Sequence, residues 1–171
     1  KTLLGSAADL NTAYVTYEIY ALGNEAVNVN SGTASTSQVN RLSAVTSGVV
    51  TATISDGDMA TLSDLNETGN AYSITITDSS VDAAALNALD DKTTVTIDAS
   101  NITTLTGSSA DLNTAYSSSG ISGLGNDPLP IITGPSGKAG DTTSSKLIYE
   151  NIATIHTFSA NEAVTWSLSG G

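Results

Sequence analysis

Three segments of the chain alternate apolar and polar residues, which is the pattern of a strand with one buried face. They span residues 51–56, 73–78 and 94–98. The isoleucines Ile54, Ile76 and Ile97 follow one another at intervals of 22 and 21 residues. We therefore predict three strands whose isoleucines form one row on the buried side.

Each of these segments follows a stretch whose apolar residues fall three and four positions apart, the spacing of one helix face. The stretches span residues 39–45, 59–65 and 83–89. Asp82 and Ser109 precede helical segments and are residue types that cap helix N-termini well. Because helices of about two turns are unstable alone in water, we expect them to pack against the strands.

One strand and one short helix in every 21 to 22 residues is the content of one coil of a solenoid. In such a fold successive strands pair in parallel, about 4.8 Å apart, and the helices lie on the other side. The sequence thus predicts a repeat solenoid with one parallel β-strand and one short helix per coil over residues 1–127.

A longer repeat overlies the short one. Residues 2–14 (TLLGSAADLNTAY) recur 102 positions later as residues 104–116 (TLTGSSADLNTAY), which indicates internal duplication. The strand of this unit falls either around Ile19 and Ile121 or at residues 26–29. We favour residues 26–29 for the first copy.

The C-terminal part has a different pattern. Pro128 and Pro130 stand where the second copy would continue, and a proline in a central strand removes a hydrogen-bond donor from the ladder. We expect a linker and then a partial all-β segment, similar to an immunoglobulin or cadherin domain, over residues 128–171. Its strands are predicted at 146–149, 153–159 and 164–168.

Composition and charge narrow the range of partners. Hydrophobic residues make up 39% of the chain but aromatic residues only 5%, so small aliphatic side chains must form a thin, regular core. The net charge of −12 disfavours nucleic acid and anionic lipid as partners. The same charge attracts divalent cations such as calcium, or simply aids solubility. The chain has no cysteine and no apolar run of about 20 residues, so we expect neither disulfides nor a membrane span.

The repeats resemble those of very large secreted haemolysin-type and surface-layer-type proteins of marine cyanobacteria. Residues 105–116 (LTGSSADLNTAY), 120–125 (GISGLG) and 81–87 (VDAAALN) carry this resemblance, which covers residues 1–127. The glycine-rich nonapeptide that binds calcium in haemolysin-type proteins is absent. The resemblance implies a secreted protein of the cell surface or extracellular matrix.

A second resemblance concerns the C-terminal part. Residues 132–137 (ITGPSG), followed by Glu150 and by residues 157–162 (TFSANE), look like the start of a bacterial cadherin-like domain. In that family acidic residues near domain junctions bind calcium. The resemblance therefore implies calcium ligation by Glu150 and Glu162.

One further motif could hold a cation. Asp56 and Asp58 flank a glycine, an arrangement that can wrap calcium, although an EF-hand loop needs more oxygen ligands at fixed spacing. The alternative is a plain turn. The single histidine, His156, has neither a nucleophile pattern nor a second histidine near it, so we expect no enzymatic activity.

The threonines of the strands form the last candidate surface. If the isoleucines face inward, alternate positions face outward as a ladder. The outward residues are Thr51, Thr53, Thr75, Thr77, Thr94 and Thr96. Such an array can order water, as in ice-binding solenoids, yet threonine also suits exposed strands by propensity. We favour a surface for protein binding or self-stacking.

The predicted function is a structural subunit of an extracellular filament, surface layer or sheath. Its partners are copies of itself joined head to tail, with other surface proteins or polysaccharide as further candidates. The assembly residues are apolar positions of the incomplete C-terminal segment, which would pair with a neighbour by strand addition. They are Leu147, Tyr149, Ile155, Phe158, Val164, Trp166 and Leu168. The alternatives are a calcium-stiffened stalk of a large adhesin and, more remotely, ice binding.

Overall fold

The computed structural model describes residues 1–16 and 22–125, where one or two short strands stand between successive short helices. In order these are β1 (Thr2–Ser6), α1 (Ala7–Val15), β2 (Ala26–Ser31), α2 (Thr36–Ser43), β3 (Val50–Thr53), α3 (Met59–Leu62), β4 (Ala71–Ser73), β5 (Ser80–Asp82), α4 (Ala83–Asp90), β6 (Ile97–Asp98), β7 (Thr104–Thr106), α5 (Ser109–Ser117) and β8 (Ile121–Ser122). All of them belong to one unit, Lys1–Gly125. The strands predicted between residues 146 and 168 lie outside the described residues.

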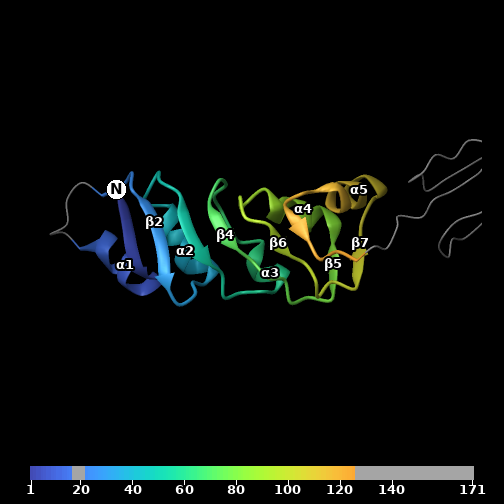
Figure 1. Ribbon diagram of the computed structural model, residues 1–171, viewed down its shortest axis with the longest axis horizontal. Helices are drawn as coiled ribbons and strands as arrows, with labels where there is room; N and C mark the ends of the chain where they lie inside the picture. Colours follow the sequence, from blue (N-terminus) through green and yellow to red (C-terminus); the bar gives the residue numbers. More distant parts are fainter. Residues whose placement is uncertain (17–21, 126–171) are drawn as a thin grey trace, which may run out of the picture. The chain divides into compact units, whose positions relative to one another are not determined.

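The strands pair in parallel throughout the described part. A four-stranded sheet has the order β1-β2-β3-β4, and two smaller sheets pair β5 with β7 and β6 with β8. Paired residues are separated by similar distances in the sequence: Thr51 lies opposite Ala71, 20 positions later, and Ser80 lies opposite Thr104, 24 positions later. Figure 1 shows the strands of the main sheet side by side in chain order. Parallel pairing, as predicted, requires the chain to cross back between strands, and the helices lie in those crossings.

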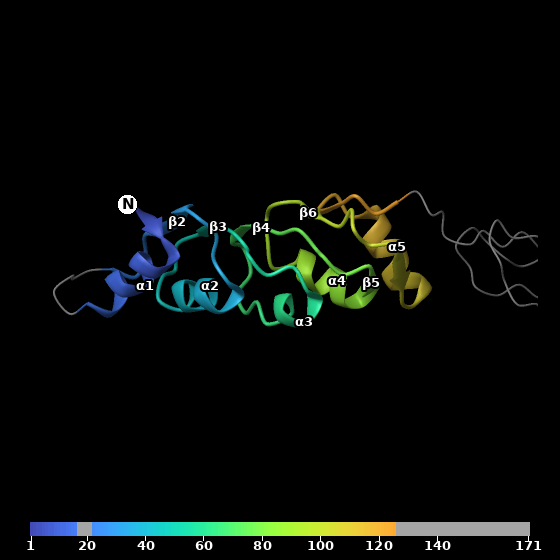
Figure 2. The same ribbon diagram turned by 90° about the horizontal axis from the view of Figure 1, so that it is seen from below.

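The helices lie on one side of the main sheet. Figure 2 shows α1 to α4 below the level of β2, β3, β4 and β6. Each helix begins at a serine or aspartate whose side chain accepts a hydrogen bond from a backbone N–H of the first turn. These N-caps are Ser6, Ser35, Asp58, Asp82 and Ser108. The cap predicted at Asp82 is confirmed, but the one at Ser109 is wrong: the Ser108 side chain accepts from Asp111 N, and Ser109 is already helical.

The register of the strands corrects the predicted isoleucine row. Thr53 lies opposite Ser73, and Thr75 lies opposite Asp98, so the register places Ile74 rather than Ile76 between Ile54 and Ile97. The crossing between β3 and β4 is shorter than predicted because α3 has only four residues. A shift by two residues moves every side chain along the strand but keeps it on the same face, since the side-chain period of a strand is two.

The strand pairs continue through single residue contacts beyond the named strands. Ala34 bridges to Ile54, and Asn70 bridges to Thr93. The second predicted strand, 73–78, overlaps β4 only at Ser73, and the third, 94–98, overlaps β6 only at Ile97 and Asp98. Val95 is 37% exposed, and its N–H bonds to the Thr93 side chain in a bend.

The core lies between the sheet and the helices. It is built from aliphatic side chains that the alternation predicted, with Tyr72 as its one fully buried aromatic in the described part. From the strands come Val27, Val50, Ile74 and Ile97, and from the helices Val39, Leu42, Leu62 and Leu86. Burying each such side chain contributes about 1.5–3 kcal/mol before entropy is counted.

Candidate functional site

The outer face of the sheet carries the predicted threonine ladder. The six threonines, Thr51, Thr53, Thr75, Thr77, Thr94 and Thr96, are all exposed. They do not form uniform rows, however, because of the register. Thr51 has Asn28 on one side and Ala71 on the other, and Thr75 faces Asp98. The face is therefore a mixed polar surface rather than a repeated threonine lattice.

Some of these threonines hold adjacent strand segments together. Thr94 Oγ1 donates to Asn70 O at 3.2 Å, and Thr96 Oγ1 donates to Ser119 O at 3.5 Å. Asp98 accepts a hydrogen bond from Ser100 N at 3.0 Å, and the Ser100 hydrogen bonds lower the pKa of its carboxyl. The polar residues of this face thus serve partly as hydrogen-bond partners that join neighbouring segments of the chain.

The two aspartates of the predicted cation motif act as acceptors for helix N-termini. Asp58 Oδ1 accepts from Thr61 N at 2.9 Å and from Thr61 Oγ1 at 2.8 Å, and these bonds lower the pKa of Asp58. Asp56 Oδ2 accepts from Thr36 N at 2.7 Å, across to the preceding helix. Asp78 repeats this with Met59 N at 2.7 Å.

These contacts account for the motif as a turn between stacked segments. Carboxylates at helix N-termini are favourable because they meet unpaired N–H groups and the positive end of the helix dipole. The glycine between them is required by space: a Cβ on Gly57 would lie 2.6 Å from Thr77 Cγ2. No group of three or more potential metal-ligating side chains occurs among the described residues. The other two predicted calcium ligands, Glu150 and Glu162, lie outside the described residues, as do the seven assembly residues from Leu147 to Leu168.

A buried carboxylate, which the sequence gave no reason to expect, lies at the start of the first sheet. Glu25 is only 2% exposed, and its Oε1 accepts from Tyr14 OH at 2.5 Å and from Gly23 N at 2.9 Å. The Tyr14 hydrogen bond is the largest cause that lowers the pKa of Glu25, while burial opposes it. Burial, followed by the Glu25 hydrogen bond, raises the pKa of Tyr14 to about 12.

The cluster links the helix α1 to the turn before β3. Thr46 Oγ1 donates to Glu25 O at 2.6 Å and accepts from Gly48 N at 3.0 Å. Tyr14 and Glu25 are eleven residues apart, so only the fold brings them together. The tyrosine recurs with the duplication, at Tyr116, but this recurrence does not indicate a buried carboxylate.

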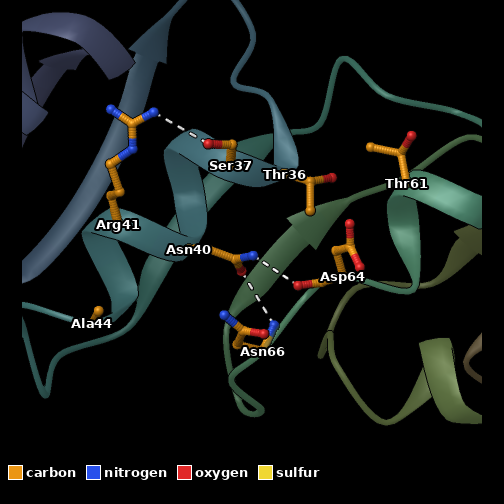
Figure 3. Close-up of a pocket in the computed structure, with 8 residues that line it drawn as sticks. All are labelled: Thr36, Ser37, Asn40, Arg41, Ala44, Thr61, Asp64 and Asn66. Carbon is orange, nitrogen blue, oxygen red and sulfur yellow. Dashed lines mark hydrogen bonds between the residues drawn. The ribbon is translucent and has the colours of Figure 1, made fainter.

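A shallow depression of about 420 Å³ lies on the helix side, between α2 and the segment after α3 (Figure 3). Its polar groups mostly bond to one another. Asn40 Nδ2 donates to Asp64 O at 2.7 Å, Asn40 Oδ1 accepts from Asn66 N at 3.1 Å, and Arg41 donates to Ser37 Oγ at 3.2 Å. The depression therefore offers a ligand few unpaired groups, and its hydrogen bonds join neighbouring helical segments.

Comparison with known proteins gives no relative to guide the interpretation. The chain matches no protein-family model, no curated protein and no solved structure. Within the described ranges, no helix is both long and apolar enough to cross a membrane.

Proposed function

We propose that this chain is a structural subunit of an extracellular assembly, such as a filament, a surface layer or a sheath. The proposal includes a finer interpretation of the fold: residues 1–127 form a β/α solenoid with one short helix in each coil. One strand per coil was predicted, but two strands lie between α3 and α4 and again between α4 and α5. The observation that carries it is the parallel register, in which the paired residues of β1, β2, β3 and β4 lie 20 to 25 positions apart in the sequence. Each coil contacts mainly its neighbours, so the two end coils keep unpaired faces.

The use of polar side chains supports a structural role over a catalytic one. Asn40, Asp56 and Asp78 each bond to backbone of a neighbouring helical segment. Thr46, Thr93 and Thr103 each donate to a carbonyl about one coil away, at 2.6 to 3.1 Å. These bonds stiffen the stack, and a stiff stack is what a subunit of a lattice or fibre requires.

The sequence suggests one way of joining subunits: residues 129–171 add strands to a neighbouring copy. Deleting these residues tests it, since the shortened chain should keep its far-ultraviolet circular dichroism per residue but no longer polymerise. Continued polymerisation of the shortened chain would exclude strand addition, while leaving other head-to-tail contacts open.

Electron microscopy of the full chain at increasing concentration tests the proposed function. We expect ordered fibres or sheets, together with sedimentation that shifts to larger species as concentration rises. Isolated rods at every concentration would contradict an assembly role. They would favour the second candidate, a calcium-stiffened adhesin stalk, which the net charge of −12 supports.

Calcium separates the two candidates further. A stalk stiffened by calcium should melt several degrees lower in excess chelator and recover when calcium is restored, because a ligand bound only by the folded state raises its stability. An assembly subunit that uses its aspartates as helix caps should melt at the same temperature with and without chelator.

A further inference from the structure

Four of the five described helices, all except α3, share one residue, and in three of them it bonds to the following helical segment. An asparagine stands at the fifth helical position of α1, α2, α4 and α5; these are Asn11, Asn40, Asn87 and Asn113. Asn11 Nδ2 donates to Gln38 O at 3.4 Å, besides Ala7 O at 2.8 Å, and Asn40 Nδ2 donates to Asp64 O at 2.7 Å. Asn87 Nδ2 donates to Asp111 O at 3.0 Å. The bonds all run from one helical segment to the following one.

The two ends of the described unit carry matching halves of this series. In the duplicated sequence Asp9 corresponds to Asp111, and Asn11 corresponds to Asn113. Asp111 O accepts a hydrogen bond from Asn87, the asparagine of the preceding helix. Asp9 O is therefore the equivalent acceptor at the N-terminal end. Asn113 is exposed at the other end, in the position of a donor. One end thus offers the donor and the other end the acceptor of the same bond.

The burial of the duplicated helices shows the same complementarity. Ala115 of α5 is 1% exposed because α4 packs against that side, whereas its counterpart Ala13 of α1 is partly exposed. Leu10 of α1 is 3% exposed and α2 packs against α1, whereas its counterpart Leu112 of α5 is partly exposed. Hence, among the described residues, nothing covers the first helix on the side facing the N-terminal end, and nothing covers the last helix on the opposite side.

The strands at the two ends of the described unit are complementary in the same way. Thr104 of β7 donates its N–H to Ser79 O at 3.0 Å, next to the parallel pairing of β7 with β5. The duplicate of β7 is β1, which ends its sheet and pairs only with β2 among the described strands. β1 also presents Leu4, which is 61% exposed. The sequence of β1 is therefore that of a strand, β7, which pairs with a preceding parallel strand, β5, elsewhere in the same chain.

We infer that a second copy of this chain stacks its α5 end on the α1 end of the first. The contact repeats the α4–α5 packing of Figure 1: Asn113 of one copy donates to Asp9 O of the next, and Leu112 and Ala13 cover each other. This contact deepens the proposed function and rests on it, but it needs no residue beyond 125. Because donor and acceptor faces lie at opposite ends, the contact is heterologous and does not close.

Two charge-introducing variants test the contact, one at each end. Ala13→Glu places a carboxylate on the acceptor face, and Leu112→Glu places one on the donor face. Ala8→Glu and Ala110→Glu are the matched controls, since both residues are exposed on the same two helices and the charge change is identical. All chains are used at full length, at physiological salt so that repulsion between copies of charge −12 is screened.

Mixing the variants shows whether polymerisation is lost because this contact is blocked or because the added charge raises solubility in general. Sedimentation velocity should show each blocked variant as a monomer where the wild type and both controls polymerise. An equimolar mixture of the two blocked variants should form a one-to-one dimer and nothing larger, because each partner keeps one working face. Asn113→Asp, which removes the donor at an exposed position, should weaken association of the wild-type chain about tenfold.

Three results would overturn the inference. If Ala13→Glu and Leu112→Glu polymerise like the wild type, the contact is elsewhere, although the proposed assembly function stands. If the wild type remains monomeric at all concentrations, both the contact and the assembly function fail. If Leu112→Glu loses its folded circular dichroism while Asn113→Asp associates normally, the α5 face is covered within the chain and is not free for a second copy.

Discussion

A close backbone approach between the turn before β3 and the start of β2 provides a sharp test of the fold. A methyl group on Gly48 would overlap the carbonyl group of Glu25 and lie 2.7 Å from Ala26 N. All of these are backbone atoms, which cannot rotate away as a side chain can. The substitution Gly48→Ala must therefore push the turn before β3 away from the start of β2.

The cost follows from the contacts that the turn makes there. Two hydrogen bonds shorter than 3.0 Å join it to the residues just before β2: Thr46 Oγ1 donates to Glu25 O at 2.6 Å, and Ser47 N donates to Gly23 O at 2.8 Å. Losing bonds worth about 1 kcal/mol each, together with about 1–3 kcal/mol of overpacking, gives roughly 3–5 kcal/mol. For a unit of this size the melting temperature should fall by roughly 10–20 °C.

Thermal and urea unfolding followed by circular dichroism measures this loss. The control is Gly5→Ala, where the new methyl would meet Leu10 Cγ at an ordinary 3.6 Å, so its stability should stay within about 0.5 kcal/mol of the wild type. A Gly48→Ala protein that melts within about 2 °C of the wild type would show that the two segments do not approach as described, and the stacking argument would fail with it.

Three further predictions concern single groups. Burial raises the pKa values of Tyr14 and Tyr72 to about 12. The stability that their protonated forms contribute is therefore complete below pH 10 and is lost as pH rises to 12. Urea melts across that pH range should show this loss of stability, and Tyr14→Phe should reduce it. Glu25 has a lowered pKa, so its contribution to folding stability is present above the ordinary glutamate pKa and is lost as pH falls below it. In Glu25→Gln this loss of stability in acid should be smaller. If stability falls in acid as it does in the wild type, the role given to Glu25 is refuted. Ser35→Ala removes a capping box on α2 and should cost about 1 kcal/mol, and Leu86→Ala empties a fully buried site and should cost about 2–5 kcal/mol; equal effects of the two substitutions in urea melts would contradict the assigned burial.

The period of the apolar residues predicted which elements form and which faces they bury. Ile54, Ile76 and Ile97 are buried, and the threonines next to them are exposed. Parallel pairing was also predictable, because a helix between two strands leaves no room for a hairpin. The pattern missed β1, β5 and β7: the short runs around Leu3 and Leu105 were interpreted only as parts of the longer repeat, and Asp82 only as a helix cap.

The candidate sites were less predictable, because a sequence does not show which backbone groups need a partner. Asp56 and Asp58 have the residue types of a cation turn, yet each accepts from a helix N-terminus, an alternative that depends on where the neighbouring helix begins. Glu25 had no local signal at all. Its partner Tyr14 comes from another element, and only the fold brings the hydroxyl to the carboxylate.

The difference between the predicted and the observed isoleucine row shows why strands are easier to predict than to align. Burial constrains a strand only to within two residues, because sliding it by two exchanges one inward residue for the next. The remaining choice is made by the length of the crossing: α3 ends at Leu62, and the chain reaches β4 early enough to put Ser73 beside Thr53. Cross-strand neighbours on the outer face follow from that choice. Any function that depends on rows of identical side chains is therefore decided by helix length, whereas a function that depends on the ends of the stack, such as head-to-tail assembly, is insensitive to it.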